Sequence, residues 1–259
     1  SLTGEPVVIT EAGKNGNYFG RLNLTFDKDG VITKIQNNLG ETRLFQKNMI
    51  NQYIINEILG QPEEVGYIKS VTPPPTTLIE ENAHANFMCD AMRAELATDI
   101  AIWNNSGTRS FFQPGVIDSR DIKDIAPFED RVSVADVSER KLVDFFKHAI
   151  EDTYRTQGNK PGLMAVSGMT YSVNPEKGIL TGISIIDKDG NEIKIDVDNP
   201  SDDKFYKVAM DSFMMFDGAD FDILAPKEEC INYPFNKDFL ACEYIKHLNE
   251  PVVINQTGR

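Results

Sequence analysis

The sequence predicts a mixed α/β fold, with α+β character in its antiparallel parts. Strand-like and helix-like segments intermix along the chain without strict alternation. Two DKDG turns, at residues 27–30 and 187–190, lie between alternating segments and predict antiparallel hairpins. No period of 20–50 residues recurs, which excludes a repeat protein. The 259 residues suffice for one large domain, or for one domain and part of another.

The first part of the chain is expected to form strands, a hairpin and a connecting helix. Residues 7–36 alternate in the manner of strands, and Gly30 supplies the positive φ that the turn between residues 18–26 and 31–35 requires. Residues 44–59 carry apolar side chains at helical spacing and stop at Gly-Gln-Pro. This segment is therefore predicted to be a connecting helix, and the proline-rich stretch 71–77 after it to be extended.

The rest of the chain is expected to pass repeatedly from strand through loop to helix. Ser138 is the predicted N-cap of the central helix, because serine accepts the free N–H groups of a first turn. The predicted helices are residues 84–97, a short one from Ser119, 139–152 and 237–249. The predicted strands are residues 98–103, 131–137, 163–173, 183–186, 192–195 and 205–210.

Charge and hydropathy exclude two classes of protein. Lys and Arg total 26 against 40 Asp and Glu, a formal net charge of −14, so the chain lacks the electrostatic footprint of a nucleic-acid binder. No apolar run approaches the ~20 residues that a membrane helix needs. We therefore expect neither a nucleic-acid partner nor a membrane span in this chain.

The cysteines and the DKDG turns give little evidence of bound metal. Cys89, Cys230 and Cys242 form an odd set without C-x-x-C spacing, which argues against a structural zinc site and a disulfide framework. Cys89 lies in an apolar helical segment and is expected in the core, whereas a Cys230–Cys242 bridge stays open. Neither DKDG turn has the glycine and glutamate spacing of an EF-hand loop, so calcium is not expected there.

The sequence contains no recognisable catalytic motif. Its three histidines, His84, His148 and His247, are far apart, and the latter two are expected on a helix surface or at a helix end. There is no H-E-x-x-H, D-x-H, G-x-S-x-G, phosphate-loop or G-x-G-x-x-G pattern. We accordingly assign no catalytic residue, no metal ligand and no cofactor to this chain, and expect it to hydrolyse nothing alone.

Loops at strand ends are the remaining candidates for binding. The turn 104–109 offers the amide of Asn104, the backbone N–H groups near Gly107 and the guanidinium of Arg109, a set suited to a phosphate, a carboxylate or a base edge. An ordinary polar turn is the alternative. Phe128 and Phe213 each follow an apolar segment. Such rings are usually core residues, whereas a pair that sandwiches a planar base contributes about 1–3 kcal/mol per stack.

These loops, in this order, resemble the C-terminal domain of the 5'-nucleotidase family, which includes UDP-sugar hydrolases and 2',3'-cyclic-nucleotide phosphodiesterases. Residues 85–92 (ANFMCDAM) are similar to the family's G-N-L-x-x-D-A-M helix, and residues 104–109 (NNSGTR) to its N-x-G-G-I-R turn. The resemblance runs from about Gly66 to the end of the chain. Its further matches are residues 125–128 (V-x-P-F), 166–171 (V-S-G-x-x-Y), 206–209 (Y-x-V-A) and the closing G-R at 258–259.

The resemblance implies a domain organisation and a fold. Residues 1–42 are expected to be the last strands of an N-terminal metallophosphatase domain, residues 43–62 a hinge helix, and residues 63–259 the substrate-binding domain. The implied fold of the last part is a layered α/β/β/α sandwich. Since the chain starts at Ser1 and opens directly into an apolar stretch, we expect a fragment of a longer protein.

The resemblance also implies partners and a compartment. In the family, two divalent metal ions in the N-terminal domain activate water and stabilise displacement at phosphorus. That domain is expected to be a partner of this chain, together with a nucleotide or nucleoside. The location expected from the family is extracellular, periplasmic or at the cell surface.

Individual roles follow by match to the family's motifs. Phe128 and Phe213 would stack on the base, and Asn104 would hydrogen-bond its edge. Arg109 and the backbone at Gly107 would meet the sugar or phosphate. The family's G-G-D-G-F loop grips the ribose and corresponds to residues 217–221, so that Asp220 or Asp217 would bind ribose here.

Two departures from the family leave alternatives open. Residues 77–81 (TLIEE) stand where family members often carry an arginine, and Ala219 stands at the position of the ribose-binding aspartate. A hydrolase for a phosphate ester other than a nucleotide is one alternative. A non-catalytic ligand-binding module, such as a receptor or adhesin, is another.

Overall fold

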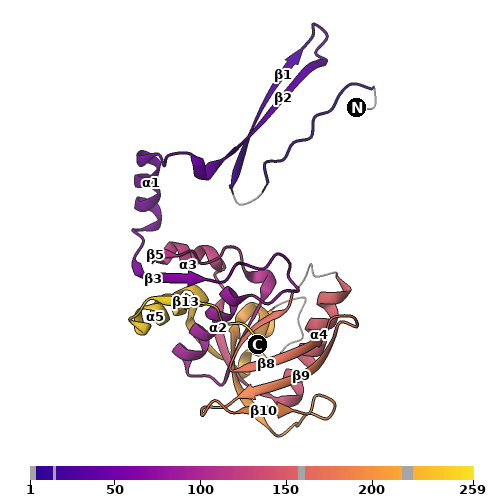
Figure 1. Ribbon diagram of the computed structural model, residues 1–259, viewed down its shortest axis with the longest axis vertical. Helices are drawn as coiled ribbons and strands as arrows, with labels where there is room; N and C mark the ends of the chain where they lie inside the picture. The colour runs from indigo at the N-terminus through magenta and orange to yellow at the C-terminus, as the bar shows by residue number, and fades with distance from the viewer. Residues whose placement is uncertain (1–3, 14–15, 157–160, 218–223) are drawn as a thin grey trace. The chain divides into compact units, whose positions relative to one another are not determined.

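The computed structural model describes residues 4–13, 16–156, 161–217 and 224–259 (Figure 1). The chain divides into two compact units, Ser1–Gln61 and Pro62–Arg259. Each unit is described by itself below. Both helices and strands occur throughout the second unit, which confirms the predicted mixed α/β class.

The first unit contains one hairpin and one helix. Strands β1 (Tyr18–Phe26) and β2 (Ile32–Glu41) pair antiparallel, and a short 3₁₀ turn, η1 (Thr42–Leu44), precedes α1 (Met49–Leu59). The hairpin turn forms as predicted: Gly30 has φ of 81°. The strand expected from residue 7 begins only at β1, since the described residues 4–13 contain no strand.

Helix α1 begins five residues later than the apolar periodicity suggests. Asn48 is its N-cap, and the side-chain oxygen accepts hydrogen bonds from the N–H groups of Ile50 and Asn51, both at 3.0 Å. None of the unit's described residues is buried. Ile9 and Met49, for example, are 93% and 78% exposed. The described part of this unit therefore has no hydrophobic core of its own.

The second unit is built from three sheets. The five-stranded sheet has the order β12-β6-β11-β4-β7, in which β11 and β4 are parallel and the other pairs antiparallel. Its strands are β4 (Ile100–Asn104), β6 (Arg131–Ser138), β7 (Met164–Ser167), β11 (Phe205–Asp211) and β12 (Ile231–Asn236). The smaller sheets are β10-β9-β8 (Glu192–Ile195, Ile179–Ile186, Met169–Asn174) and β13-β3-β5 (Val252–Ile254, Glu64–Val71, Gly115–Asp118).

Within the described residues of this unit, four α-helices pack on these sheets. Helix α2 contacts β4, β7 and β11, and it also contacts α5; helix α4 contacts β6 and β9. The helices are α2 (Ala83–Leu96), α3 (Ser119–Ile125), α4 (Glu139–Arg155) and α5 (Lys237–Leu248). Short helical turns are η2 (Asn105–Gly107), the π-helix η3 (Phe213–Asp217) and η4 (Lys227–Glu229). The predicted N-cap of α4 is confirmed, because Ser138 Oγ accepts the Lys141 N–H at 3.3 Å.

The core of the second unit explains several features of the sequence. Its largest fully buried rings are Trp103, Phe87, Phe112, Phe145 and Phe146. Cys89 is buried, as predicted, and all three cysteines are free, so the Cys230–Cys242 bridge is not formed. Within the described residues, no helix is both long and apolar enough to cross a membrane.

A charged cluster fixes helix α2 to the end of the chain. The Arg259 guanidinium contacts both carboxylate oxygens of Asp90, at 2.6 and 2.9 Å. The Glu81 carboxylate accepts the backbone N–H groups of Gly258 and Arg259 at 2.8 and 3.0 Å. Asn86, between these acids in sequence, is buried and bonds to both β7 and the C-terminal segment. Bidentate pairs of this kind are strong and directional.

The histidines occupy structural positions. His148 and His247 lie near Asp152 (3.2 Å) and Glu95 (2.9 Å) on helices, as expected for surface residues. His84 is buried against Phe111 and Phe112, and its Nε2 lies 2.9 Å from the Thr72 carbonyl oxygen, whereas Nδ1 has no hydrogen-bond partner among the residues that the structure describes. Burial lowers the pKa of His84 below its usual value, because removal from water disfavours the charged imidazolium, and the hydrogen bond with the Thr72 carbonyl only partly opposes this shift.

We expect His84 to make the protein less stable on acidification. Its pKa is lower in the folded state than in the unfolded state, so the unfolded state binds more protons below about pH 6.5. The unfolding midpoint of the wild type should then fall between pH 7.5 and pH 5.5 by more than that of His84→Gln. His247→Gln is the contrasting control, because Glu95 raises the pKa of His247 and its contribution is lost as pH rises. Equal pH slopes in the wild type and His84→Gln would contradict the assignment.

Candidate functional site

Several strand ends meet at one end of the five-stranded sheet. Because β4 and β11 are parallel, their carboxyl ends, at Asn104 and Asp211, lie at the same end. Strand β6 is antiparallel to β11 and begins there, with Val132 opposite Asp211, and β12 ends there, with Asn236 opposite Arg131. The loops that carry Asn104, Phe128 and Phe213 therefore leave the sheet at the same end. Crevices at the carboxyl ends of strands are frequent ligand sites in α/β proteins.

Asn104 and Gly107 are closely packed at the start of the turn. The Asn104 amide nitrogen donates to Ser106 Oγ at 2.7 Å, and the residue is only 8% exposed. A Cβ at Gly107 would lie 2.7 Å from Trp103 Nε1 and 2.9 Å from Asn104 Oδ1, closer than real Cβ contacts. Only glycine at position 107 therefore leaves room for this placement of the Asn104 side chain.

Arg109 lies on Phe128. Its guanidinium carbon is 4.9 Å from the centre of the Phe128 ring, a cation–π contact. The same guanidinium donates to the Ser106 carbonyl oxygen, and the Arg109 N–H donates to the Ile125 carbonyl oxygen at 2.9 Å. The turn 104–109 is thus joined to the loop that carries Phe128, and the Arg109 head group bridges them.

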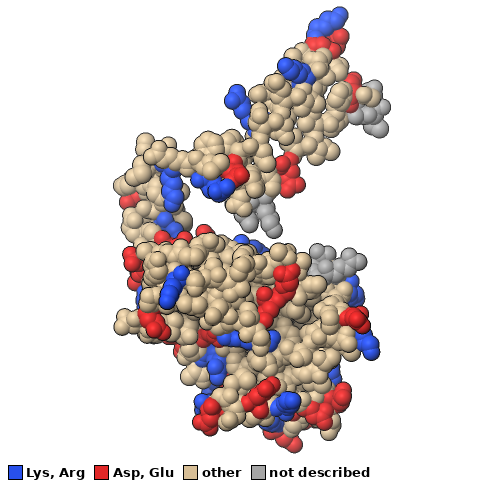
Figure 2. Space-filling model, viewed as in Figure 1, with Lys and Arg blue, Asp and Glu red and all other residues tan. Residues whose placement is uncertain are grey.

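An exposed ion pair adjoins Phe128. The Lys123 ammonium lies 2.7 Å from Glu129 Oε1, and this hydrogen bond holds the pKa of Glu129 below its usual value. Lys123 also lies 3.6 Å from Asp238 at the start of α5. Figure 2 shows acidic and basic side chains mixed on the visible face, without one continuous basic area there.

Phe213 begins the π-helix that follows β11. It is 42% exposed, whereas Met214 and Met215 beside it are buried. The Asn104 backbone N–H donates to Met214 Sδ at 3.2 Å, which links this helix to the turn 104–109. Met214 N–H in turn donates to Asp211 Oδ1 at 2.9 Å. Phe213 therefore directly precedes the residue, Met214, that contacts the Asn104 backbone.

The structure brings together most of the residues that the sequence singles out. Asn104, Gly107, Arg109 and Phe128 share direct contacts or common partners, and Phe213 is linked to Asn104 through Met214. Asp220 lies outside the described residues. The sequence analysis missed the buried acid and ammonium beneath this site, Asp211 and Lys237. An aspartate at the end of an apolar strand was the one signal for them.

Residues 76–81 form a loop in which an acid is bound by neighbouring threonines. The Glu80 carboxylate accepts hydrogen bonds from Thr76 Oγ1 at 2.6 Å and Thr77 Oγ1 at 3.0 Å. These bonds, together with one from the Thr76 backbone, lower the pKa of Glu80.

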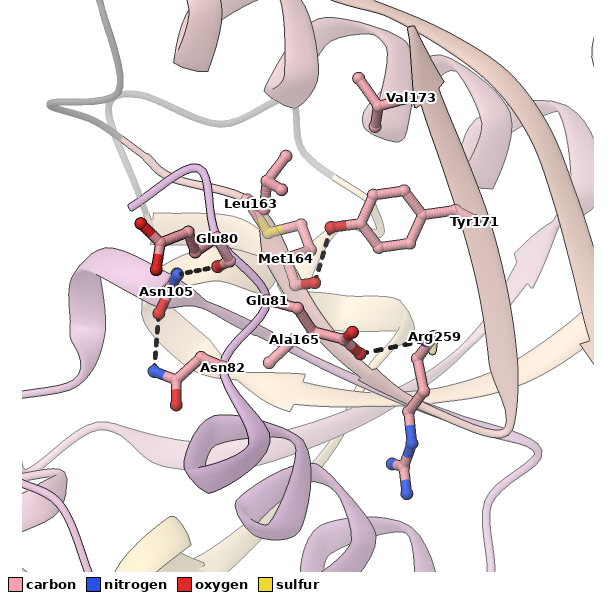
Figure 3. A pocket seen from close by; sticks show the side chains of 10 residues that line it. All are labelled: Glu80, Glu81, Asn82, Asn105, Leu163, Met164, Ala165, Tyr171, Val173 and Arg259. Atoms are coloured by element: carbon pink, nitrogen blue, oxygen red, sulfur yellow. Dashed lines mark hydrogen bonds between the residues drawn. The ribbon is translucent and has the colours of Figure 1, made fainter. Parts of the chain in front are cut away.

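A small cavity lies beside Asn105 of the turn 104–109 (Figure 3). It measures about 170 Å³. Asn105 donates to the carbonyl oxygens of Leu78 and Glu80, and Tyr171 donates to that of Met164 at 2.8 Å. Burial raises the pKa of the Tyr171 hydroxyl, which keeps it a donor. The cavity is lined by Glu80, Glu81, Asn82, Asn105, Leu163, Met164, Ala165, Tyr171, Val173 and Arg259.

The described residues offer no metal site. No group of three or more His, Cys, Asp or Glu side chains among them is placed to hold an ion. This arrangement does not fit the two-metal centre that the family resemblance implies for a phosphoesterase.

Comparison with known proteins gives one family. Residues 64–226 match the family model for the 5'-nucleotidase C-terminal domain. The Trifunctional nucleotide phosphoesterase protein YfkN of Bacillus subtilis (strain 168) is 22% identical, over 98% of this chain and 18% of that protein. The Apyrase of Tabanus yao is 23% identical, over 99% of this chain and 49% of that protein.

Solved structures agree with this fold. The crystal structure of a 5'-nucleotidase precursor from Thermus thermophilus superposes with a TM-score of 0.68 at 17% identity, and the match covers 99% of this chain and 52% of that one. At this identity the likeness shows the fold. The chain spans about half or less of the length of these relatives.

Proposed function

The chain belongs to the 5'-nucleotidase family through its C-terminal domain, and we propose on this basis that Pro62–Arg259 binds the nucleoside part of a nucleotide substrate for a larger phosphoesterase. The observation that carries the proposal is the meeting of Asn104, Gly107, Arg109 and Phe128 at one end of the sheet, with the exposed ring of Phe213 linked to them.

The base is assigned to the two phenylalanine rings. A flat ring face accepts any base, and stacking contributes about 1–3 kcal/mol per base. The side-chain amide of Asn104 both donates and accepts, so it would select among base edges. Arg109 covers part of Phe128 and would meet the sugar or phosphate with the backbone at Gly107. Asp220 is proposed to bind the ribose. This assignment rests only on the similarity of its loop to the family's ribose-binding loop.

Hydrolysis is assigned to the rest of the larger protein. The metal-binding domain expected from the family would supply the two divalent ions, and the described residues of this chain do not fit them. Residues 1–42 would belong to that domain and residues 43–62 would act as the hinge. The exposed apolar side chains of the hairpin and α1 support this, because a surface of this kind is normally covered by a partner.

The larger protein is proposed to act outside the cytoplasm, in the periplasm, at the cell surface or in the extracellular space. The family resemblance supports this location, and the similar structure from Thermus thermophilus is that of a 5'-nucleotidase precursor.

Titration calorimetry tests the binding proposal. Adenosine, AMP and UMP are titrated into the wild type, Phe128→Ala and Phe213→Ala, and each substitution should weaken binding about 10- to 100-fold by removing one stack. Phe205→Ala is the matched control, since Phe205 is an exposed ring at the opposite end of β11. Unchanged affinity in both ring variants, or no binding by the folded wild type at millimolar ligand, would contradict the proposal.

The same titration distinguishes the proposed function from a second candidate function. The acid at Glu80 in place of a family arginine favours a ligand without a 5'-phosphate, or a role as a non-catalytic binding module. A phosphate-directed site should bind AMP more tightly than adenosine. A site that has lost this preference should bind adenosine at least as tightly as AMP.

A further inference from the structure

A buried ion pair lies directly beneath the candidate site. The ammonium of Lys237, the first residue of α5, lies 2.8 Å from Asp211 Oδ2, and the two side chains are 1% and 4% exposed. The same ammonium lies 5.5 Å from the centre of the Trp103 ring. The pair thus touches the ends of β11 and β4 and the start of α5.

Stability alone does not explain this pair. A lysine at the first position of a helix faces the positive end of the helix dipole. Removing both charges from water is also costly, and apolar pairs of similar volume are often as stable or more so. Buried ionic pairs are known in some proteins to specify one arrangement of neighbouring elements. In this domain, Asp211 contacts the start of the π-helix, so the pair would specify how this helix is placed.

Asp211 connects the pair to Phe213. Its second oxygen, Oδ1, accepts the Met214 N–H at 2.9 Å and so fixes the first turn of the π-helix that Phe213 begins. The sulfur of Met214 accepts the Asn104 N–H at 3.2 Å. A shift of Asp211 would therefore move the Phe213 backbone and the Asn104 backbone together.

Lys237 connects the pair to the turn 104–109. It lies over the face of Trp103, and Trp103 Nε1 lies 2.7 Å from the position that a Cβ at Gly107 would take. Trp103 immediately precedes Asn104 in β4. The ion pair thus joins the two segments that carry the proposed base-binding and edge-binding groups.

We propose that Asp211 and Lys237 are positioning residues of the ligand site, which set the place of Phe213 relative to Asn104. The inference rests on the proposed function. The pair touches no ligand itself; it acts through the Met214 N–H and through Trp103.

The test uses Asp211→Asn/Lys237→Met, a double variant that removes both charges, keeps an acceptor for the Met214 N–H and leaves no unpaired buried charge. Lys237→Met alone is measured beside it. Two quantities are compared with the wild type: the affinity for adenosine by calorimetry and the amide hydrogen exchange of residues 213–217. Circular dichroism and thermal unfolding confirm that each variant is folded at the assay temperature.

Lys204→Met is the matched control. Lys204 lies just before the other end of β11, 3.1 Å from Glu139 and 5.4 Å from the centre of the Tyr206 ring, so it is also a lysine with an acid and a ring. We expect the folded double variant to bind adenosine at least 10-fold more weakly, with faster exchange in residues 213–217. The control should match the wild type in both quantities.

The outcomes separate this inference from the proposed function. If the double variant exchanges residues 213–217 as slowly as the wild type, the positioning role is overturned, whatever the ligand. If it exchanges them faster and the wild type binds no adenosine, the pair positions this segment and the nucleoside proposal fails. If exchange is faster but affinity is unchanged, the segment moves without serving the ligand and the inference is wrong.

Discussion

Gly107→Ala is expected to abolish most nucleoside binding while leaving the domain folded. The new methyl group would lie 2.7 Å from Trp103 Nε1 and 2.9 Å from Asn104 Oδ1, so the Asn104 side chain has to leave its place. If Asn104 reads the edge of the base, its displacement removes that hydrogen bond and narrows the site. We expect at least a 10-fold loss of affinity for adenosine, or about 1.4 kcal/mol, measured by titration calorimetry.

Gly182→Ala provides the control for this substitution. Gly182 lies in β9, and a Cβ there would meet no heavy atom within 4 Å. The Gly182→Ala variant should therefore bind adenosine with the affinity of the wild type. If Gly107→Ala also retains wild-type affinity, the turn 104–109 does not contact the ligand, and the assignment of Asn104 and Gly107 is wrong.

Among the substitutions proposed for this protein, Asn86→Ala is expected to lower the free energy of unfolding the most. The side-chain oxygen of Asn86 accepts the Val166 N–H at 3.1 Å, and its amide nitrogen donates to the Gln256 carbonyl oxygen at 2.8 Å and to Glu81 at 3.0 Å. The residue is 1% exposed, so alanine leaves buried polar groups without partners. We expect the free energy of unfolding to fall by about 2–5 kcal/mol, measured by urea denaturation.

The control for Asn86→Ala is Asn38→Ala in the exposed strand β2 of the other unit. Surface substitutions of this kind usually change stability by less than about 0.5 kcal/mol. An effect of Asn86→Ala equally small would show that helix α2 is not held to β7 and the C-terminal segment through this side chain.

The parts of the fold that depend on local chemistry were predicted from the sequence. Ser138 caps α4, Gly30 turns the first hairpin, and Cys89 is buried in α2. The turn 104–109 was recognisable because six polar or small residues follow an apolar strand. The cap, the hairpin turn and the turn 104–109 depend on neighbours within a few residues, and such neighbours are visible in one sequence. The burial of Cys89 was indicated by the apolar helical segment around it.

The parts that depend on distant contacts were not predicted. A lysine at a helix start is expected at the surface, but Lys237 is buried because Asp211, 26 residues earlier, lies beside it. The contact of Arg109 with Phe128 likewise depends on the relative placement of two loops. One local feature was also missed: helix α1 starts at Met49 and not at residue 44, because Asn48 supplies a cap that apolar periodicity does not detect.

Two features of the site bear on which ligand it takes. The loop at residues 76–81 binds its own acid, Glu80, through threonine hydroxyls, and Ala219 stands at the family's ribose-binding position. Under the proposed function, the family's residues at these two positions would contact the sugar or phosphate, and this sequence lacks both of them, whereas it keeps both candidate base-stacking rings. The base is therefore the part of the ligand that we expect this chain to recognise most strongly.

A crystal structure of the protein with adenosine at saturating concentration tests the central claim most directly. We predict that the base lies between the rings of Phe128 and Phe213, with its edge within hydrogen-bond distance of the Asn104 side chain. Adenosine bound elsewhere, for example in the cavity beside Tyr171, or a site left empty at saturation, would contradict the account.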